Sequence, residues 1–433
     1  MATAFVARRT LLKAGLKAGL GALALTVGRI PAGLAQDKRL RMYWWGGKER
    51  ADRTFKVNEL YAARHPGVTI DGETLGWGDY WARLATQAAG RNAPDILQMD
   101  YRYIFEYARR GALLPLDQFM PKALDIADFG KDAIDSGRVD GKVYGVSLGL
   151  NSMALLYSKT AYESAGLKPP THETAWVQFA ELSTELTKAN KGTYWGSMDG
   201  GGTEPAFEAW VRQRGKALYT QEGKLGFDAT DAGDWLAFWD DMRKRKACVP
   251  ADVQSLDRNS NETAMLSQGK AATAFEHSNL LVGYQAINQH KLSMTMYPQS
   301  GPGTKPGQYL KPSQMWSVYA RSKFGDEAAR IVNFFVEDPE AAKVLKVERG
   351  VPASTAMRNL IAPELSEIDR ESITYITLVS ERVGPLPAPP PNGAGEVQQA
   401  LRRINEEVGF GRLAPAAAGK QFVEEAKSII ARG

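Results

Sequence analysis

Just beyond residue 37, the spacing of apolar and polar residues switches repeatedly between the periodicity of a strand and that of a helix. The predicted order is strand, helix, strand, helix, strand. These segments are residues 39–45, 50–63, 67–74, 80–89 and 95–99. This order at this spacing predicts a largely parallel sheet covered by helices. We therefore expect an α/β fold.

The rest of the chain continues with both kinds of segment. Extended patterns occur at 143–146, 154–157, 271–275 and 314–320, and helical patterns at 171–190, 205–214, 231–246, 261–269 and 327–336. A loop rich in glycine and proline is predicted between the third and fourth extended patterns. Roughly the last forty residues are predicted to be helical and amphipathic.

The ends of the first three predicted strands carry aromatic and polar residues. Parallel sheets bind ligands at the carboxyl ends of their strands. Trp44 and Trp45 stand at the first of these ends, Trp77 at the second, and Asp100 and Tyr101 at the third. We expect these residues to lie along one edge of the sheet.

Residues 1–36 have the three-part pattern of an export signal and are not expected to belong to the fold. Arg8 and Arg9 open the segment, an apolar run follows at 18–28, and small residues stand at 33–35. The twin arginine followed by Leu-Leu-Lys resembles a Tat signal. We expect cleavage near Ala35, export to the periplasm, and no membrane span, because no apolar run is long enough.

Net charge and cysteine content exclude several classes of function. The formal charge of +5 belongs to the five basic residues of the signal, which leaves equal numbers of basic and acidic residues beyond it. A chain without net charge has no general attraction for nucleic acid or anionic lipid. The single cysteine, Cys248, and four scattered histidines argue against disulfides, metal sites and metal cofactors. We expect no cofactor.

Ser147 lies in a Gly-x-Ser-x-Gly sequence, which matches the nucleophile elbow of serine hydrolases. That motif needs a helix directly after the serine, whereas the residues that follow favour another extended segment. An exported hydrolase that uses Ser147 remains the enzymatic alternative. A glycine-bordered strand is the simpler interpretation, and we expect no catalytic residues.

The tryptophans are the most informative candidates for binding. Several of the ten stand at predicted strand ends or in loops, namely Trp44, Trp45, Trp77, Trp195 and Trp316. An indole covers the apolar face of a sugar ring, and carboxylates or amides satisfy its hydroxyl rim. Suitable polar partners stand at strand ends, and they are Asp100, Asn151, Glu276 and Asn279.

Several motifs in a fixed order resemble the family 1 extracellular solute-binding proteins of bacterial ABC importers. They include Trp-Trp-Gly-Gly at 44–47, Ala-Pro-Asp-Ile-Leu-Gln-Met-Asp at 93–100, Leu-Leu-Pro-Leu at 113–116, Gly-Lys-Val-Tyr-Gly-Val-Ser at 141–147, the segments 151–159 and 165–167, Gly-Lys-Ala-Ala at 269–272, and Arg-Gly-Val-Pro-Ala at 349–353. Each motif is loose alone, but their order and spacing together are specific and cover nearly the whole chain after residue 36.

The resemblance implies a two-lobed periplasmic binding fold with a central cleft and hinge crossings. One lobe would hold 37–150 and about 298–352, and the other 151–297 and about 353–433. The chain would act as a monomer, capture a carbohydrate and deliver it to a membrane permease. Carried over by position, the residues of the cleft would be Trp44, Trp45, Trp77, Asp100, Tyr101, Asn151, Glu276, Trp316 and Arg349.

The segment 44–50 resembles binding proteins for pectin-derived oligosaccharides, so that Arg50 or Arg349 would pair with a uronate. The chain departs from those relatives after Arg50, where alanine stands in place of histidine. A neutral oligosaccharide is the alternative. Binding of a non-sugar solute, a polyamine or a phosphodiester, is a further alternative. A cleft rich in carboxylates and poor in stacked indoles would favour the polyamine, and a basic cleft the phosphodiester.

Overall fold

The computed structural model describes residues 37–301 and 303–432, with helices and strands from β1 (Lys38–Trp45) to α16 (Pro415–Arg432). The predicted export signal at 1–36 lies outside these residues. Within the described range, none of the helices combines the length and the apolar character needed to cross a membrane.

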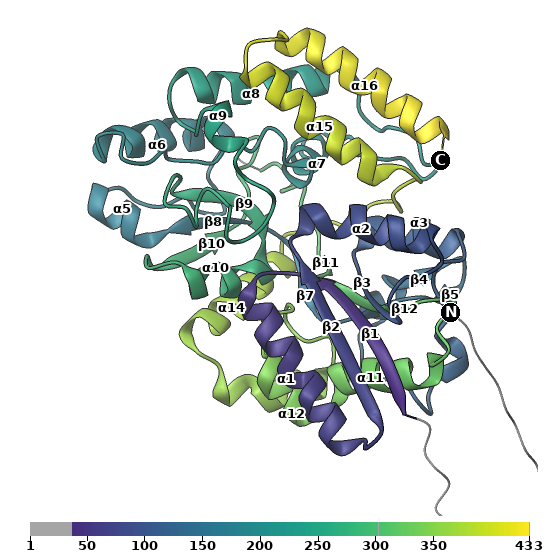
Figure 1. Ribbon diagram of the computed structural model, residues 1–433. Helices are drawn as coiled ribbons and strands as arrows, with labels where there is room; N and C mark the ends of the chain where they lie inside the picture. The colour runs from purple at the N-terminus through teal and green to yellow at the C-terminus, as the bar shows by residue number, and fades with distance from the viewer. Residues whose placement is uncertain (1–36, 302, 433) are drawn as a thin grey trace, which may run out of the picture. The chain divides into compact units, whose positions relative to one another are not determined.

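The first main sheet has five strands in the order β2-β1-β3-β12-β6 (Figure 1). Besides β1, its strands are β2 (Val68–Leu75), β3 (Ile96–Met99), β6 (Val146–Ser147) and β12 (Met315–Val318). β1 pairs in parallel with β2 and β3, and β12 is antiparallel to β3 and β6. The predicted strand and helix order over 39–99 is confirmed, and the sheet also includes a strand from far along the chain.

Helices cover both faces of this sheet. They are α1 (Lys48–Arg64), α2 (Trp77–Ala89), α3 (Tyr101–Arg109), α11 (Gly325–Glu337) and α12 (Pro339–Leu345), with the short elements η1 (Asp117–Phe119), α4 (Lys131–Asp135), β4 (Arg138–Val139) and β5 (Lys142–Val143) nearby. Successive side chains of a strand point to opposite faces. Met42 and Trp44 of β1 therefore join a core with α1, α11 and α12, whereas Tyr43 and Trp45 join a core with α2 and α3.

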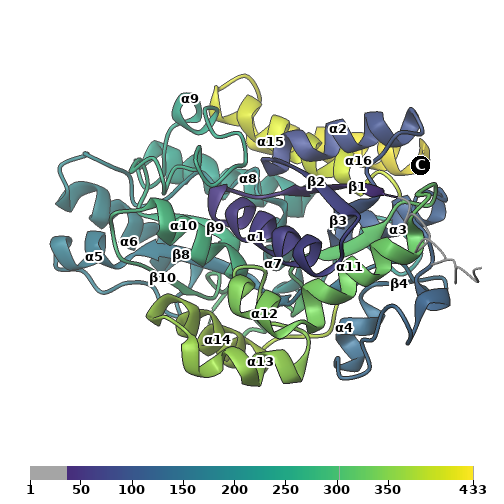
Figure 2. The same ribbon diagram turned by 60° about the horizontal axis from the view of Figure 1, so that its bottom comes forward.

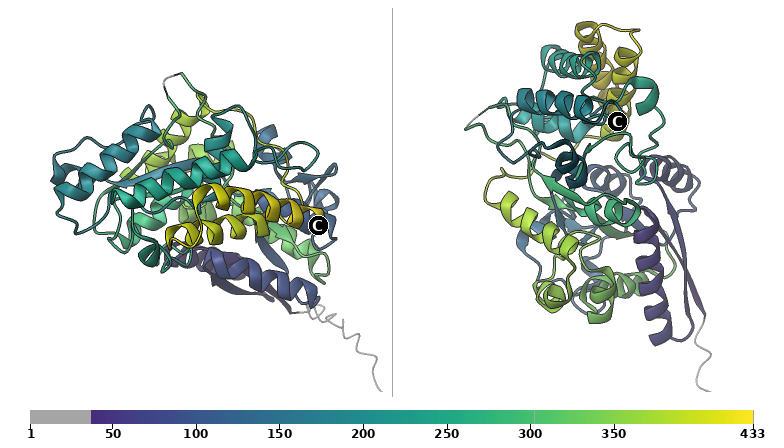
Figure 3. Two further views of the ribbon diagram at one scale, coloured as in Figure 1. Left: turned by 90° about the horizontal axis from the view of Figure 1, so that it is seen from above. Right: turned by 90° about the vertical axis from the view of Figure 1, so that its left-hand side faces the viewer.

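The second sheet is antiparallel, in the order β10-β8-β9. Its strands are β8 (Met153–Ser158), β9 (Thr273–His277) and β10 (Leu292–Thr295). The surrounding helices are α5 (Lys159–Ala165), α6 (Trp176–Ala189), α7 (Glu204–Arg212), α8 (Ala229–Lys244), α9 (Ala251–Gln254), η2 (Ser278–Leu280), α10 (Leu281–Ile287), α14 (Glu367–Ser380) and α15 (Ala394–Gly409). α13 (Thr355–Ile361) instead packs on α11 and α12 beside the first sheet, and η3 (Ala362–Glu364) follows it. α15 and α16 pack on α8 (Figure 3), and α14 packs on α10. α13 lies beside α12 (Figure 2).

The helix predicted at 261–269 is wrong, because the structure has only turns there. Polar side chains hold the backbone in turns directly before this segment. Asp257 accepts from the backbone N–H of Asn259 at 2.8 Å, and Thr263 accepts from that of Arg258 at 3.0 Å. The resulting loop, 257–261, lies beside the cavity described below.

The chain passes between the two sheets through a narrow crossing. β7 (Leu150–Asn151) pairs with β11 (Lys311–Pro312) in a separate two-stranded ladder. A side chain at Gly149 would lie 2.7–2.8 Å from the backbone of residues 349–351, so only glycine fits at this crossing.

Ser147 lies just before this crossing. Its hydroxyl is buried and donates to the carbonyl of Gly149 at 3.1 Å. The strand β7, and not a helix, follows it along the chain. The strand-to-helix turn that a nucleophile elbow requires is therefore absent at Ser147.

Candidate functional site

A cavity of about 200 Å³ is lined from both sheets. The first sheet contributes the residues that follow β1, β2 and β3, including Trp45, Trp77 and Asp100. The second sheet contributes the end of β9 with Glu276 and His277. The carboxyl ends of the three parallel strands thus meet at one side of the cavity, as expected for an α/β sheet.

The structure brings seven of the eleven candidate ligand residues to this cavity. They are Trp45, Arg50, Trp77, Asp100, Asn151, Glu276 and Asn279. It places the other four elsewhere, and they are Trp44, Tyr101, Trp316 and Arg349. Trp195 also lies off the lining and packs against the core of the second sheet.

The four side chains off the lining are held in the interior of the first sheet's cores. Trp44 is fully buried and lies edge-on to Phe55 at 5.2 Å, because alternation along β1 turns it away from Trp45. Trp316 occupies the same core. Tyr101 lies in the opposite core, edge-on to its helix neighbour Phe105.

The guanidinium group of Arg349 is held by contacts with other residues of the protein. Its guanidinium stacks on Trp316 at 4.9 Å and donates to Thr54 at 2.6 Å and also to Gln98. Burial lowers the pKa of Arg349 to about 9, and the nearby Arg50 guanidinium adds to the fall while Glu348 opposes it. The side chain is therefore not placed to meet a ligand in this cavity.

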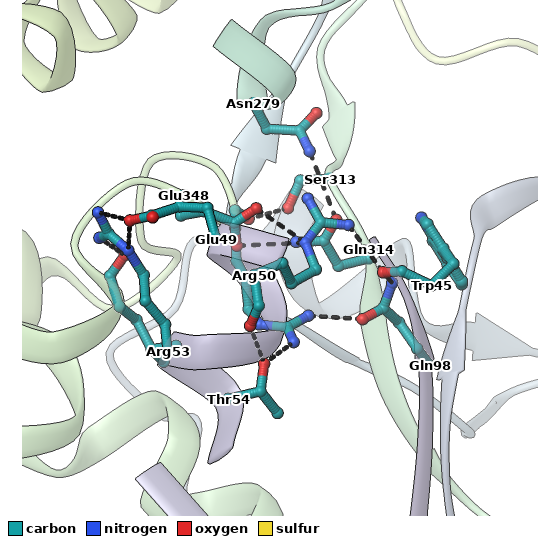
Figure 4. A network of polar contacts seen from close by, with 12 residues as sticks. Trp45, Glu49, Arg50, Arg53, Thr54, Gln98, Asn279, Ser313, Gln314 and Glu348 are labelled. Carbon is teal, nitrogen blue, oxygen red and sulfur yellow. Dashed lines mark hydrogen bonds and ion pairs between the residues drawn. The ribbon is translucent and has the colours of Figure 1, made fainter. Parts of the chain in front are cut away.

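Arg50 reaches the lining but is held by an ion pair (Figure 4). Its Nε donates to the two carboxylate oxygens of Glu348 at 2.9 and 3.2 Å, and its Nη1 donates to the carbonyl of Trp45 at 3.1 Å. Both charged side chains are buried. Gly46 makes room for the guanidinium stem, since a side chain there would lie 2.4 Å from Cδ of Arg50. The first loop of the site is thereby fixed in place.

Aromatic rings form much of the apolar wall. Trp45 and Trp77 lie perpendicular with ring centroids 5.0 Å apart, and Trp81 contacts both. Trp77 is half-buried, so part of its indole faces the cavity. Phe275, Tyr284 and Tyr297 contribute rings from the second sheet's side. Such edge-to-face contacts hold the indoles in fixed orientations.

Buried amides form a short ladder across the floor of the cavity. The side-chain amide of Asn151 donates to Asn279, whose own amide donates to Gln314 at 3.5 Å. The Oδ1 of Asn151 and the Nε2 of Gln314 have no partner in the described chain although both are buried. Buried polar atoms are normally hydrogen-bonded. One unpaired acceptor and one unpaired donor on the lining are therefore suited to ligand hydroxyl groups.

Ion pairs surround this ladder. Lys311 donates to Asp100 at 3.0 Å, and Arg102 pairs with Glu204 and donates to Gln398 at 3.0 Å. Burial alone would raise the pKa of Asp100, but the Lys311 and Arg102 charges outweigh it and the pKa lies below its usual range. Burial raises the pKa of Glu204 to about 7 even though Arg102 opposes the rise. The Arg102 pair joins α3 beside the first sheet to α7 beside the second.

Glu276 differs from the other acidic residues of the lining. One of its oxygens accepts from the Tyr284 hydroxyl at 2.6 Å. Burial raises its pKa to about 7, and the Asp257 carboxylate adds to the rise while Tyr284 opposes it. The neighbouring His277 is kept neutral, because burial and the Lys311 charge hold its pKa well below its usual range.

The pattern of the sequence did not identify several residues of the site. They are Arg102, Lys311, Gln314 and Tyr284. Arg102 follows Asp100 at the same strand end, so the strand-end argument could have included it. The others become neighbours only through packing between the sheets. Among the described residues, no group of three or more His, Cys, Asp or Glu side chains is arranged to hold a metal ion.

Comparisons with known proteins agree with this architecture. The family described as bacterial extracellular solute-binding protein matches residues 57–367. A lactose-binding protein of Rhizobium radiobacter is 25% identical over 366 residues, which cover 79% of this chain and 80% of that protein. Among solved structures, a periplasmic oligogalacturonide binding protein from Yersinia enterocolitica, in complex with saturated digalacturonic acid, has a TM-score of 0.82 at 21% identity and covers 91% of this chain and 99% of its own.

A second solved structure is similar. The ABC substrate-binding protein from Listeria monocytogenes, in complex with cycloalternan, has a TM-score of 0.78 at 18% identity and covers 92% of this chain and all of its own. These likenesses establish the two-lobed α/β binding fold that the sequence predicted. Since the family pattern spans most of the chain, this protein belongs to the bacterial extracellular solute-binding proteins.

Proposed function

We propose that this protein is the substrate-binding subunit of an ABC importer and that it captures an oligosaccharide in the cavity between the two sheets. One observation carries the proposal: Trp45 and Trp77 share a cavity with the unpaired amide atoms of Asn151 and Gln314. Indoles cover the apolar face of a sugar ring, and fixed amides bind its hydroxyls. The similarity to proteins that bind lactose, oligogalacturonide and cycloalternan supports a carbohydrate ligand.

The mechanism that we propose is hinge closure around the crossing formed by β7 and β11. We assign 37–150 and about 298–352 to one lobe, and 151–297 and about 353–433 to the other. A ligand that touches both lobes favours the closed form only to the extent that it binds that form more tightly. No bond is made or broken, and the loaded monomer then delivers its sugar to a membrane permease.

The arginine and lysine side chains on the lining are already ion-paired, which favours a neutral oligosaccharide over a uronate. Arg50 is neutralised by Glu348, Arg102 by Glu204, and Lys311 by Asp100. Binding of an anion would require breaking one of these largely buried pairs or the more exposed pair of Arg402 with Glu406. A phosphodiester is also an anion and is disfavoured for the same reason. We further propose export to the periplasm by the Tat route, on the basis of Arg8 and Arg9.

The test is calorimetric titration of the chain 37–433 with a panel of neutral mono-, di- and oligosaccharides and their amino-sugar and uronate counterparts. We expect saturable heat with at least one sugar, no turnover, and a smaller radius of gyration by X-ray scattering when the ligand is bound. Absence of binding across the whole panel would contradict the proposal.

A pair of variants locates the binding site. Trp77→Ala removes an indole from the lining and should weaken binding by about 2 kcal/mol, roughly thirtyfold. Phe410→Ala removes an exposed ring that does not line the cavity and should leave the affinity unchanged. Equal affinities for both variants would place the sugar elsewhere.

A further inference from the structure

Ion pairing leaves the lining of the cavity with surplus negative charge. Every lysine and arginine on the lining has an acidic partner, in the pairs Arg50–Glu348, Arg102–Glu204, Lys311–Asp100 and Arg402–Glu406. Asp199, also on the lining, pairs with Arg243. Two lining carboxylates, Asp257 and Glu276, have no ion-pair partner in the described part of the chain.

The two unpaired carboxylates differ in how far the protein satisfies them. Asp257 accepts hydrogen bonds on both oxygens, from the backbone of Asn259 at 2.8 Å and from Thr263 and Gln254 side chains at 3.3 and 3.4 Å. Arg402 lies close enough to lower the pKa of Asp257, against the rise that burial causes. Asp257 therefore acts mainly as the anchor of the loop 257–261.

Glu276 keeps one oxygen without a protein partner. Its Oε1 accepts from Tyr284 at 2.6 Å, but within residues 37–301 and 303–432 no hydrogen bond reaches its Oε2. The side chain is half-buried at the end of β9 and lines the cavity. A desolvated carboxylate with a free oxygen is costly unless a cation or donor meets it. The described chain supplies a donor to Oε1 but none to Oε2, so when the carboxyl group is ionised a partner for Oε2 must come from the ligand or from water.

Aromatic rings that share the cavity with this carboxylate suit the same kind of partner. Tyr284 and Tyr297 both donate hydrogen bonds to Glu276, to its carboxylate and its backbone carbonyl respectively, and Trp77 lines the same cavity. The face of an aromatic ring attracts a cation, most strongly where water is excluded. Asp257 lies near enough to Glu276 to raise its pKa, which adds a second negative charge to this end of the site.

We propose that the ligand is an oligosaccharide of amino sugars with a free, positively charged amine, and that the Oε2 atom of Glu276 binds this ammonium group. The inference rests on the proposed carbohydrate function and adds the charge of the ligand to it. Asn151 and Gln314 bind hydroxyl groups, while Glu276 selects the amine. A uronate at the same place would add negative charge beside Glu276 and Asp257 without an available cation.

Matched sugars test the charge of the ligand. Cellobiose and the β-1,4-linked dimer of glucosamine differ only in the groups at C2, and the galactose, galactosamine and galacturonate dimers form a second series. In whichever series binds, calorimetry should show that the amino sugar binds at least tenfold more tightly than its neutral counterpart. The uronate should bind most weakly. A neutral sugar or uronate that binds best overturns this inference and leaves the carbohydrate function standing. No binding in either series, or tightest binding of a free polyamine such as spermidine, overturns both.

Glu276→Gln tests the residue. Glutamine can still accept from Tyr284, so the fold is expected to persist. The variant should lose at least tenfold in affinity for the amino sugar and stay within threefold of the wild type for the neutral one. Glu173→Gln makes the same chemical change at an exposed position off the lining and should change neither affinity. Unchanged selectivity in Glu276→Gln would overturn the assignment.

Discussion

Replacing Glu348 with glutamine should destabilise the protein far more than an ordinary loss of an ion pair. Glu348 is the carboxylate between two buried guanidinium groups: it accepts from Arg50 at 2.9 Å, and its charge raises the pKa of Arg349. Arg50, Glu348 and Arg349 are each no more than 3% exposed. Glutamine has nearly the same shape as glutamate, so the variant would keep the packing of these three residues. It would remove the negative charge that the three residues share.

The expected cost follows from burial. Removing one partner of a buried ion pair costs about 3–5 kcal/mol, because the other charge remains desolvated. Typical free energies of unfolding are about 5–15 kcal/mol, so the loss is a large part of the total. The ion pair of Glu49 with Arg53, at 2.7 Å, lies on the helix α1 that also carries Arg50 and serves as a control. The side chains of Glu49 and Arg53 are 31% and 19% exposed, respectively. Glu49→Gln should cost no more than about 1 kcal/mol.

Urea denaturation of wild type, Glu348→Gln, Glu49→Gln and the double variant Arg50→Met/Glu348→Gln measures these differences at constant slope. The double variant should recover part of the loss, since it removes one of the two unpaired cations. If Glu348→Gln costs no more than Glu49→Gln, the Arg50 guanidinium does not depend on Glu348. Arg50 would then be available to a ligand carboxylate, and the argument against a uronate would fail.

Three further outcomes are expected. Gly46→Ala should cost about 1–3 kcal/mol in urea denaturation, because Gly46 has a φ of 151° and its new methyl would meet Arg50, whereas Gly130→Ala, with open space, should be neutral. Glu276 keeps a proton in the folded state up to pH about 7 that the unfolded chain loses near its ordinary pKa of 4.5, so its contribution to stability falls as pH rises between these values. Melting temperatures of Glu276→Gln relative to wild type should therefore increase from pH 5 to pH 8, and a constant difference would refute this. Cys248 is buried with a raised pKa, so a thiol reagent should label it only in denaturant, and rapid labelling of the native protein would contradict its burial.

Local patterns predicted the first sheet well because its strands and helices depend on nearby residues. The order over 39–99 and the meeting of three strand ends follow from periodicity and from the rules of parallel sheets. The same periodicity limits what adjacent tryptophans can do. Trp44 and Trp45 must point to opposite faces, so only one of them could line the cavity. Which one does depends on the helices that cover each face, and this is not a local property.

The partners in the buried ion pairs could not be predicted from the sequence, for a different reason. Arg50 meets Glu348 across 298 residues, and Lys311 meets Asp100 across 211. Neither spacing has a pattern that a single sequence could reveal. The segment 261–269 shows the opposite limit: its local periodicity predicted a helix, but the structure has turns there.

These pairings change how a binding motif is interpreted in this fold. The Trp-Trp-Gly-Gly segment followed by Arg50 resembles uronate binders, yet an arginine selects an anion only if its charge is not already neutralised. Here Glu348 neutralises it, and the carboxyl groups of the lining without an ion-pair partner in the described chain are those of Asp257 and Glu276. A chain with the same motif but a neutral residue at position 348 would present a free guanidinium at the same strand end. Specificity for the charge of the ligand therefore depends on the acidic residue that packs behind the motif, and not on the motif alone.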